Sequence, residues 1–321
     1  MKAIVHQEYG PAEVLRYTEV GKPSIGDDQV LVRVRAASIN HGDRVAMTGT
    51  PRIARLAFGL RRPRQTILGR DIAGTVELAG ANVTGLQVGD EVFGEMSQRG
   101  FAEYVAAPEP HLAPIPAGVT FEQAATLPVA AATALQALRL GQVEPGRTVL
   151  VNGASGGVGT FAVQLARTLG AEVTGVCSTR NAELVRSIGA HHVIDYARED
   201  VTRGAGRFDA IVDLAGNHRL SAFRGILAPK GVYVSSSGVG GAVLGPLPRL
   251  FAIAVTSPFV SQRLRGLTAK RSVDDLTFLA GLVATGKLTP VIQRTYPLSE
   301  TADAIRFIEA EHARGKVVLT V

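Results

Sequence analysis

The chain has 321 residues, 46 % hydrophobic and 19 % charged, which is typical of soluble globular proteins and long enough for two cores. The net charge of +6 and the pI of about 9.7 favour an anionic ligand, such as a phosphorylated cofactor. The chain lacks lysine runs interleaved with aromatic residues, a bilayer-length apolar stretch and a recognisable signal peptide, which argues against nucleic-acid and membrane partners and predicts a cytoplasmic protein. Cys177 is the only cysteine, so an intramolecular disulfide and a multi-cysteine zinc site are excluded.

The first 120 residues predict a compact β-barrel-like domain, because short apolar or alternating segments are separated by glycine and proline turns. The predicted strands cover residues 1–6, 29–36, 72–78, 91–94 and 101–106. Residues 50–65 differ, with five arginines and no acidic residue. We favour an exposed loop or short helix there. The alternative is a flexible lid or a contact for an anionic ligand beside the active site.

A proline-rich stretch around residues 113–118 predicts a linker, and a helix follows over residues 120–140. Thr120 with Gln123 three residues later forms a capping-box pattern, and Gly141 is a plausible stop. From residue 148 onward strands alternate with helices, which predicts a parallel sheet with helices on both faces. The predicted strands are 149–151, 172–177, 192–194, 210–213 and 231–235, and the predicted helices are 159–169, 181–188 and 221–227.

The last segments, residues 290–296 and 315–321, again predict strands, and we expect both to return to the first domain. The predicted organisation is therefore an α/β chain with a doubly wound Rossmann domain at residues 120–285. It is inserted into a barrel domain formed by residues 1–119 and 286–321.

The stretch from residue 149 to residue 170 is the strongest functional signal. An apolar strand, the glycines Gly153, Gly156 and Gly159, and an apolar-periodic helix follow one another. A helix start leaves unpaired N–H groups with partial positive charge, and glycine lets a phosphate approach. The strict fingerprint has a glycine where Ala154 stands, and the alternative is an ordinary strand-to-helix turn. The predicted cofactor contacts here are Ala154, Ser155, Gly156, Gly157 and Val158.

The end of the second strand predicts NADPH rather than NADH. In NAD sites this strand usually ends on an acidic residue that holds the ribose hydroxyls. Here the sequence continues as Ser178-Thr179-Arg180, with no carboxylate. Ser178 and Arg180 can supply the donors and the positive charge that a 2′-phosphate needs. The alternative is that Arg180 only occupies a helix start.

Several segments together resemble the medium-chain dehydrogenase/reductase superfamily, in its zinc-free quinone oxidoreductase branch. They are AASINHGD (36–43), GRDIAGTV (69–76), GDEVFG (89–94), GFAEYVAAP (100–108), NGASGGVG (152–159), GAHHVIDY (189–196) and GKVVLTV (315–321). The resemblance implies a GroES-like β-barrel catalytic domain, a Rossmann domain, a cleft between them and often a homodimer joined through the Rossmann sheets.

The same resemblance argues against catalytic zinc. The places of two zinc ligands in the zinc-dependent branch fall on Asn40 and Arg70. Arginine is not a realistic zinc ligand, and asparagine lacks the charge and softness of a thiolate. In zinc-free relatives an asparagine at the Asn40 place can donate to a substrate carbonyl oxygen, which would stabilise an enolate-like product. The alternative is a turn residue that satisfies its own backbone. His41 and Asp43 are further catalytic candidates as proton relays, and Val45, where some relatives carry tyrosine, implies a more apolar pocket.

The resemblance also places later strand ends near the nicotinamide and its ribose. These residues are Leu214, Ala215, Ser235, Ser236 and Ser237, and Tyr196 flanks the adenosine phosphate or is a packing residue. Lys270 and residues 244–267 close the substrate cleft or form a dimer contact, and the sequence leaves both possibilities open.

Three functions follow. The first is an NADPH-dependent reductase of quinones or α,β-unsaturated carbonyls. The second is a zinc-independent alcohol or ketone dehydrogenase, or a biosynthetic enoyl reductase. The third, from another class, is a non-catalytic NADPH-binding protein, which the basic charge motivates.

Overall fold

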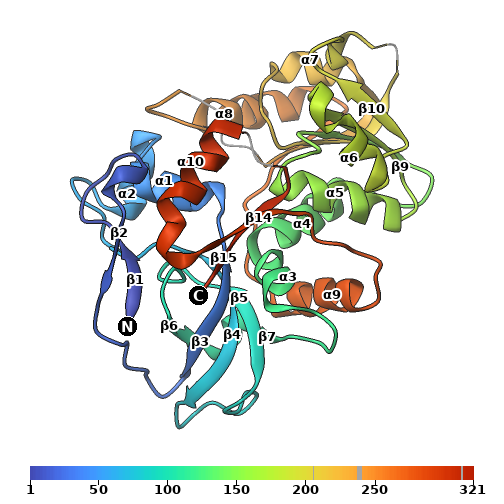
Figure 1. The fold of residues 1–321 in the computed structure, drawn as a ribbon. Helices are drawn as coiled ribbons and strands as arrows, with labels where there is room; N and C mark the ends of the chain where they lie inside the picture. The colour runs from blue at the N-terminus through green and yellow to red at the C-terminus, as the bar shows by residue number, and fades with distance from the viewer. Residues whose placement is uncertain (205, 237–240, 312–313) are drawn as a thin grey trace. The chain divides into compact units, whose positions relative to one another are not determined.

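The structure is a computed structural model that describes residues 1–204, 206–236, 241–311 and 314–321 (Figure 1). It contains two compact units, which are Met1–Ala132 with Arg271–Val321 (unit 1) and Thr133–Lys270 (unit 2). In the part of the chain that is described, no helix combines the length and the apolar character that crossing a membrane requires.

Unit 1 is built on a seven-stranded sheet in the order β14-β15-β3-β4-β5-β7, with β6 also paired to β3. Its strands are β3 (Gln29–Ser38), β4 (Asp71–Ala79), β5 (Glu91–Glu95), β6 (Tyr104–Pro108), β7 (Leu112–Pro114), β14 (Ile292–Pro297) and β15 (Lys316–Thr320). A separate ribbon pairs β1 (Lys2–Val5) with β2 (Arg16–Glu19). All five strands predicted in this region are present. Two strands were not predicted. The four residues of β2, RYTE, are all exposed and carry no hydrophobic alternation, and β7 has only three residues, two of which fall in the stretch predicted as a linker.

Unit 1 also contains five α-helices among its described residues. They are α1 (His41–Thr48), α2 (Arg55–Phe58), α3 (Phe121–Ala125), α9 (Val273–Ala284) and α10 (Thr301–Glu311). Of these, α3, α9 and α10 pack against strands of the sheet. The arginine-rich stretch forms two short helical turns, η2 (Arg52–Ala54) and α2, in agreement with the favoured interpretation. The Thr120–Gln123 capping box is also confirmed, since each side chain accepts the other's backbone N–H.

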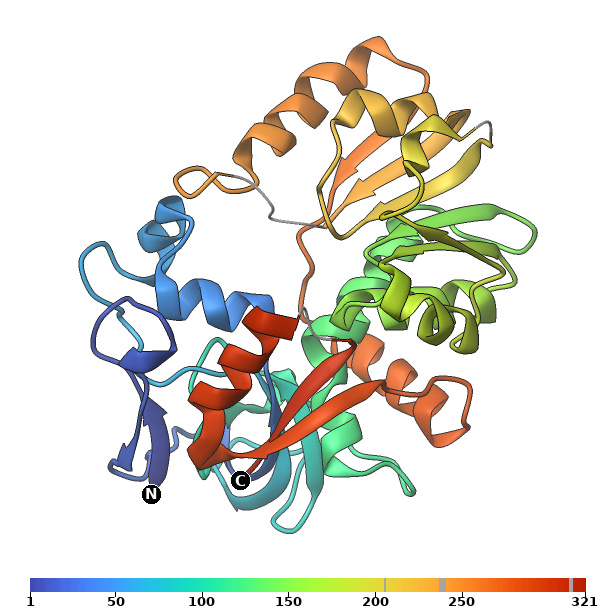
Figure 2. The same cartoon turned by 45° about the horizontal axis from the view of Figure 1, so that its top comes forward.

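The return of the C-terminal strands to the first domain is confirmed. β15 pairs antiparallel with β3, so that Val318 lies opposite Ser38, and β14 pairs parallel with β15 (Figure 2). This register carries Lys316, the first residue of β15, to the end of β3, where α1 begins.

Unit 2 contains a six-stranded, wholly parallel sheet in the order β10-β9-β8-β11-β12-β13. Read in chain order this is 3-2-1-4-5-6, the order of a dinucleotide-binding Rossmann sheet. Its strands are β8 (Thr148–Asn152), β9 (Glu172–Cys177), β10 (His192–Asp195), β11 (Phe208–Asp213), β12 (Leu227–Ser235) and β13 (Arg263–Gly266). Its helices are α4 (Ala132–Leu140, from the unit boundary), α5 (Gly157–Thr168), α6 (Ala182–Ser187), α7 (Leu220–Gly225) and α8 (Leu247–Thr256). β13 and α8 were not predicted.

The boundaries of the compact units differ from the predicted domain boundaries. Residues 120–132 and 271–285, which were predicted to belong to the Rossmann domain, are part of unit 1. The reason is packing: α3 lies against β3 and β4, and α9 lies against β7. The strand-and-helix alternation marks the Rossmann strands from β8 to β12, but it carries no information about which sheet the flanking helices cover.

Candidate active site

The glycine loop lies between the end of β8 and the start of α5. Gly153 has φ +90°, and a Cβ on Gly159 would lie 2.1 Å from the Gly153 carbonyl oxygen. Only glycine therefore allows the first turn of α5 to approach the loop this closely. Ala154 is buried and its N–H donates to the Val176 carbonyl oxygen, so it contributes shape rather than a donor. Ser155, Gly156, Gly157 and Val158 are half-buried at the helix start, where unpaired N–H groups favour an anion.

The loop after β9 is tied to the glycine loop. Ser178 is half-buried and precedes the turn η5 (Thr179–Asn181), in which Arg180 is exposed. Asn181 is buried, and its Nδ2 donates to Ser155 Oγ at 3.0 Å. Its Oδ1 is buried with no hydrogen-bond partner among the described residues, which marks a polar atom that a ligand could satisfy. Asn181 was not among the predicted cofactor contacts.

An acidic residue lies one strand away from the end of β9. Asp195 ends β10 opposite Cys177 in the register, and it accepts a hydrogen bond from Thr179 Oγ1 at 2.6 Å. The Asp195 carboxylate is therefore hydrogen-bonded to the hydroxyl of Thr179, the residue before Arg180. The residue after Asp195, Tyr196, is 56 % exposed, so it is not a packing residue of the core. Asp195 could have been found, because the carboxyl ends of parallel strands meet at one edge.

The later strand ends reach the same edge of the sheet as the glycine loop. A Cβ on Gly153 would lie 3.5 Å from Leu214 Cβ and 3.6 Å from Ala215 Cβ. Ser235 ends β12 and is buried, while Ser236 donates its N–H to the Asp213 carbonyl oxygen. Leu214 and Ala215 therefore lie against the loop, and the strand register places Ser235 and Ser236 at the same edge of the sheet. Ser237, also predicted, lies outside the described residues.

A buried carboxylate, Asp213, organises this edge. It accepts hydrogen bonds from Asn152 Nδ2 at 2.8 Å, Tyr233 Oη at 2.6 Å and the Gly216 N–H at 2.8 Å. Arg249 of α8 pairs with Asp213 at 3.3 Å and also donates to the Gly216 carbonyl oxygen. Carboxylates with several charge-assisted bonds are rigid, so this cluster fixes the turn that carries Leu214 and Ala215.

Unit 1 holds a second polar cluster, centred on Asn40 at the start of α1. The Asn40 Oδ1 accepts from Lys316 Nζ at 2.6 Å, and its Nδ2 donates to Asp71 Oδ2 at 2.9 Å. A longer bond of 3.3 Å runs from Nδ2 to the Ser38 carbonyl oxygen. An ammonium only donates and a carboxylate only accepts, so these partners fix the direction of the amide.

Neighbouring elements satisfy the Asp71 carboxylate. Ser38 lies opposite Asp71 in the β3–β4 register and donates its hydroxyl at 3.0 Å. The Val129 N–H donates to Asp71 Oδ1 at 3.1 Å. Val129 belongs to the π-helical segment Leu127–Ala131 and follows Pro128, which has no N–H of its own. The π-segment therefore directs a backbone donor to Asp71, a use that such segments often have at functional sites.

The charged groups of this cluster are almost fully buried, with exposed fractions of 0 % for Asp43 and Asp71 and 2 % for Lys316. Burial raises the pKa of Asp71 to about 6 against the effect of Lys316, and it raises the pKa of Asp43 to about 7 against its bond from the Asn40 N–H. Burial also lowers the pKa of Lys316, which Asp71 and Asp43 oppose. Desolvation thus outweighs pairing at all three groups.

The three predicted catalytic residues occupy different positions. Asp43 is buried and caps α1 by accepting the Asn40 N–H at 2.8 Å, so it positions Asn40. His41 is exposed at the first turn of the same helix. Only Asn40 combines partial exposure with a place in the buried cluster. Lys316 and Asp71 belong to this cluster and were missed as site residues. Both residues lie in segments that carry the family resemblance, 69–76 and 315–321, so these segments could have pointed to them.

The donors at the two zinc-ligand places do not fit zinc. The Arg70 guanidinium forms an ion pair with Glu95, and the Asn40 amide is engaged as described. Among the described residues, no group of three or more His, Cys, Asp or Glu side chains could hold a metal ion.

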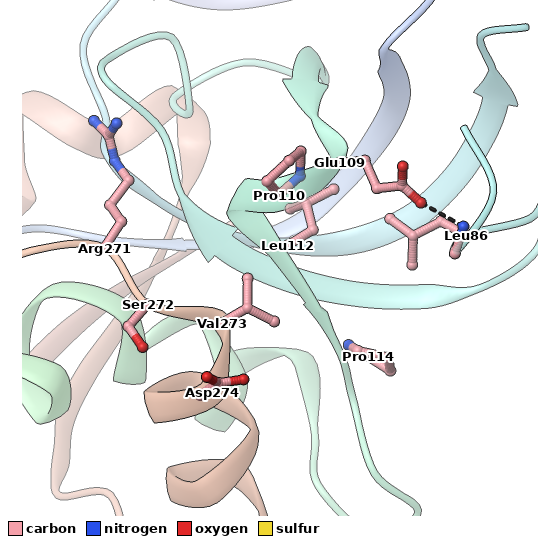
Figure 3. Close-up of a pocket in the computed structure, with 10 residues that line it drawn as sticks. Leu86, Glu109, Pro110, Leu112, Pro114, Arg271, Ser272, Val273 and Asp274 are labelled. Carbon is pink, nitrogen blue, oxygen red and sulfur yellow. Dashed lines mark hydrogen bonds between the residues drawn. The ribbon is translucent and has the colours of Figure 1, made fainter. Parts of the chain in front are cut away.

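A hollow of about 600 Å³ lies elsewhere on unit 1, between β7 and the start of α9 (Figure 3). Its lining includes Leu86, Leu112 and Val273, and the Glu109 carboxylate there accepts the Gly85 N–H. None of the predicted site residues lines it, so we do not include it in the candidate site.

Two family descriptions match the chain. Residues 26–117 match "Alcohol dehydrogenase GroES-like domain", and residues 188–319 match "Zinc-binding dehydrogenase".

Similar proteins of known name cover almost the whole chain. The "NADPH-dependent alkenal/one oxidoreductase, chloroplastic" of Arabidopsis thaliana is 32 % identical over 99 % of this chain and 79 % of its own length. The "Quinone-oxidoreductase homolog, chloroplastic" of Spinacia oleracea is 32 % identical over 99 % of this chain and 98 % of its own. The solved structure of the quinone oxidoreductase from Coxiella burnetii superposes with a TM-score of 0.89 at 31 % identity, covering 100 % of this chain and 99 % of that one.

The pKa of Asp43 predicts a pH dependence of stability. The folded-state pKa is about 7 against an ordinary 3.8, so the folded protein keeps a proton that the unfolded chain releases between these values. The stability that this proton provides is present at low pH and is lost as the pH rises through about 7. Asp43→Asn retains an acceptor for the Asn40 N–H and never becomes charged. We compare the free energy of unfolding of the variant with that of wild type at each pH. We expect the difference, variant minus wild type, to increase by more than about 1 kcal/mol from about pH 5 to pH 8.

Denaturant titrations of both proteins across this range measure the difference. The exposed Asp27→Asn serves as the control and should follow wild type at every pH. A constant difference between Asp43→Asn and wild type from about pH 5 to pH 8 would show that Asp43 does not titrate there.

Proposed function

Because the chain belongs to the medium-chain dehydrogenase/reductase superfamily, in its quinone oxidoreductase branch, we propose that this oxidoreductase uses NADPH to reduce a quinone or an α,β-unsaturated carbonyl without zinc. The observation that carries the proposal is the Asn40 amide, held between Lys316 and Asp71 at a place where zinc-dependent relatives have a metal ligand.

The residues of unit 2 support a bound NADPH. The start of α5 offers N–H groups to the pyrophosphate, and the tight approach at Gly159 shapes the cradle. Ser178 and Arg180 would hold the 2′-phosphate, with Asn181 tying their turn to the glycine loop. When bound, NADPH supplies the hydride.

Asn40 would stabilise the charge that develops on the substrate oxygen. Hydride addition to a quinone, or to the β-carbon of an enone, places negative charge on that oxygen, and a fixed N–H donor stabilises it. Nδ2 makes its shorter bond to Asp71, so a substrate oxygen would compete with the Ser38 carbonyl oxygen for the other hydrogen. Asp43 holds the Asn40 backbone, and the exposed His41 can exchange a proton with solvent.

Two further properties are part of the proposal. We propose a homodimer joined through the Rossmann sheets, which the position of β13 supports: it ends the sheet, with no further strand beside it among the described residues. We also propose a cytoplasmic location, with which the buried free thiol of Cys177 is compatible.

We expect the purified protein to oxidise NADPH in the presence of a quinone panel, an enone panel or both. Product analysis separates reduction of C=C from reduction of C=O, and the second result alone would favour the alternative, a zinc-independent ketone reductase. Asn40→Ala should lower kcat by about a hundredfold with NADPH binding unchanged, while the surface variant Asn82→Ala should match wild type. A protein that binds NADPH but turns over neither panel would refute the proposal.

Arg180→Ala tests the cofactor assignment. Loss of the guanidinium should raise the KM for NADPH by about tenfold or more and leave the KM for NADH unchanged, because only NADPH carries the 2′-phosphate. Arg186→Ala, an exposed arginine in α6, is the matched control. Equal effects on both cofactors in Arg180→Ala would show that Arg180 does not bind the 2′-phosphate.

A further inference from the structure

We infer that Lys316 is a positioning residue for the reaction: it holds the Asn40 amide oxygen so that the amide N–H not bonded to Asp71 remains a donor for the substrate oxygen. This inference rests on the proposed function for its catalytic consequence. Its structural part concerns unit 1 alone.

The backbone places Lys316 beside Asn40. β15 pairs with the end of β3, and the Ile39 N–H donates to the Val317 carbonyl oxygen at 3.1 Å. The Lys316 side chain then lies along the turn between β3 and α1, where its Nζ also donates to the Ile39 carbonyl oxygen at 3.2 Å. The strand pairing places the lysine, and one bond to a backbone carbonyl and one to the amide oxygen fix its ammonium at the oxygen end of the amide.

The distances distinguish this role from that of a simple ion pair. Lys316 Nζ lies 2.6 Å from Asn40 Oδ1 but 3.7 Å from Asp71 Oδ2. A lysine kept only to neutralise Asp71 would make its shortest contact with the carboxylate, since charge-assisted bonds of this kind have an optimum near 2.8 Å. Here the shortest contact goes to the neutral amide, which lies between the two charges.

The arrangement affects the amide in two ways. The cation at the amide oxygen draws electron density away from the nitrogen, which strengthens the amide N–H groups as donors. The ammonium also balances the buried charge of Asp71. Without it, Asp71 would be protonated more readily, and a protonated carboxyl can donate to the amide oxygen. The Asn40 amide could then flip and present its oxygen to the substrate, and this oxygen would repel an enolate-like product.

A double-mutant cycle between Lys316 and Asn40 tests the inference. We expect Lys316→Met to lower kcat by about tenfold or more with the KM for NADPH unchanged, because positioning errors act on the chemical step. In an Asn40→Ala background, Lys316→Met should change kcat by less than about twofold, since the group through which Lys316 acts is gone. Lys316→Arg should recover part of the activity. Lys287→Met, an exposed lysine of the same unit, should match wild type.

Losses that multiply in the double variant would overturn the inference, because Lys316 would then act independently of Asn40. If the single variant Lys316→Met does not fold, the double variant Lys316→Met/Asp71→Asn takes its place in the cycle, because it removes both buried charges together. That background leaves the expectation unchanged: the loss must disappear when Asn40 is alanine.

A spectroscopic measurement separates failure of the inference from failure of the proposed function. The side-chain amide signals of Asn40, assigned by their absence in Asn40→Ala after selective ¹⁵N-asparagine labelling, should shift in Lys316→Met and stay unchanged in Lys287→Met. Signals that do not move in Lys316→Met would overturn the inference, whether or not the protein turns over quinones or enones. Wild type without turnover, but with the expected shift, would instead refute the proposed function alone.

Discussion

The structure of unit 1 depends on two buried charges, Lys316 and Asp71, that lie on either side of the Asn40 amide. Burying a lysine and an aspartate is expensive unless each is paired and hydrogen-bonded. Both conditions are met: the ammonium reaches the amide and the Ile39 carbonyl oxygen, and the carboxylate accepts bonds from Ser38, Asn40 and Val129. The last strand of the chain and the end of β3 thus meet on a polar contact as well as on apolar ones. As a consequence, the Asn40 amide is held rigidly.

Unit 2 solves a comparable problem at the carboxyl edge of its sheet. Asp213 collects donors from β8, β12 and the following turn, while the Ser155–Asn181 contact joins the glycine loop to the end of β9. These bonds fix the backbone before any ligand arrives, which is what a phosphate cradle requires. In both units, buried polar groups do the positioning, and Asn40 and Ser155, which are proposed to meet ligand, lie beside them with partial exposure.

The sequence alone predicted the elements with a clear period or a glycine signal. Alternation located the strands of unit 1 except β2 and β7, the apolar runs located five of the six Rossmann strands, and the glycine loop located the cradle. It did not reveal β13, whose RLRG sequence lacks a sustained apolar pattern, or the packing of α3 and α9 on the barrel sheet. It identified Asn40 but not Lys316, because residues 276 positions apart meet only through strand pairing. It also treated Asp43 as a proton relay without foreseeing its burial.

The central claim is that a held amide, and not a metal, stabilises the developing charge. The most direct test measures enone or quinone reduction by protein dialysed against a strong chelator, with zinc content determined on the same sample. The account predicts that kcat is unchanged when zinc is absent and that added zinc does not raise it. Activity that disappears with the metal and returns when zinc is restored would contradict the account.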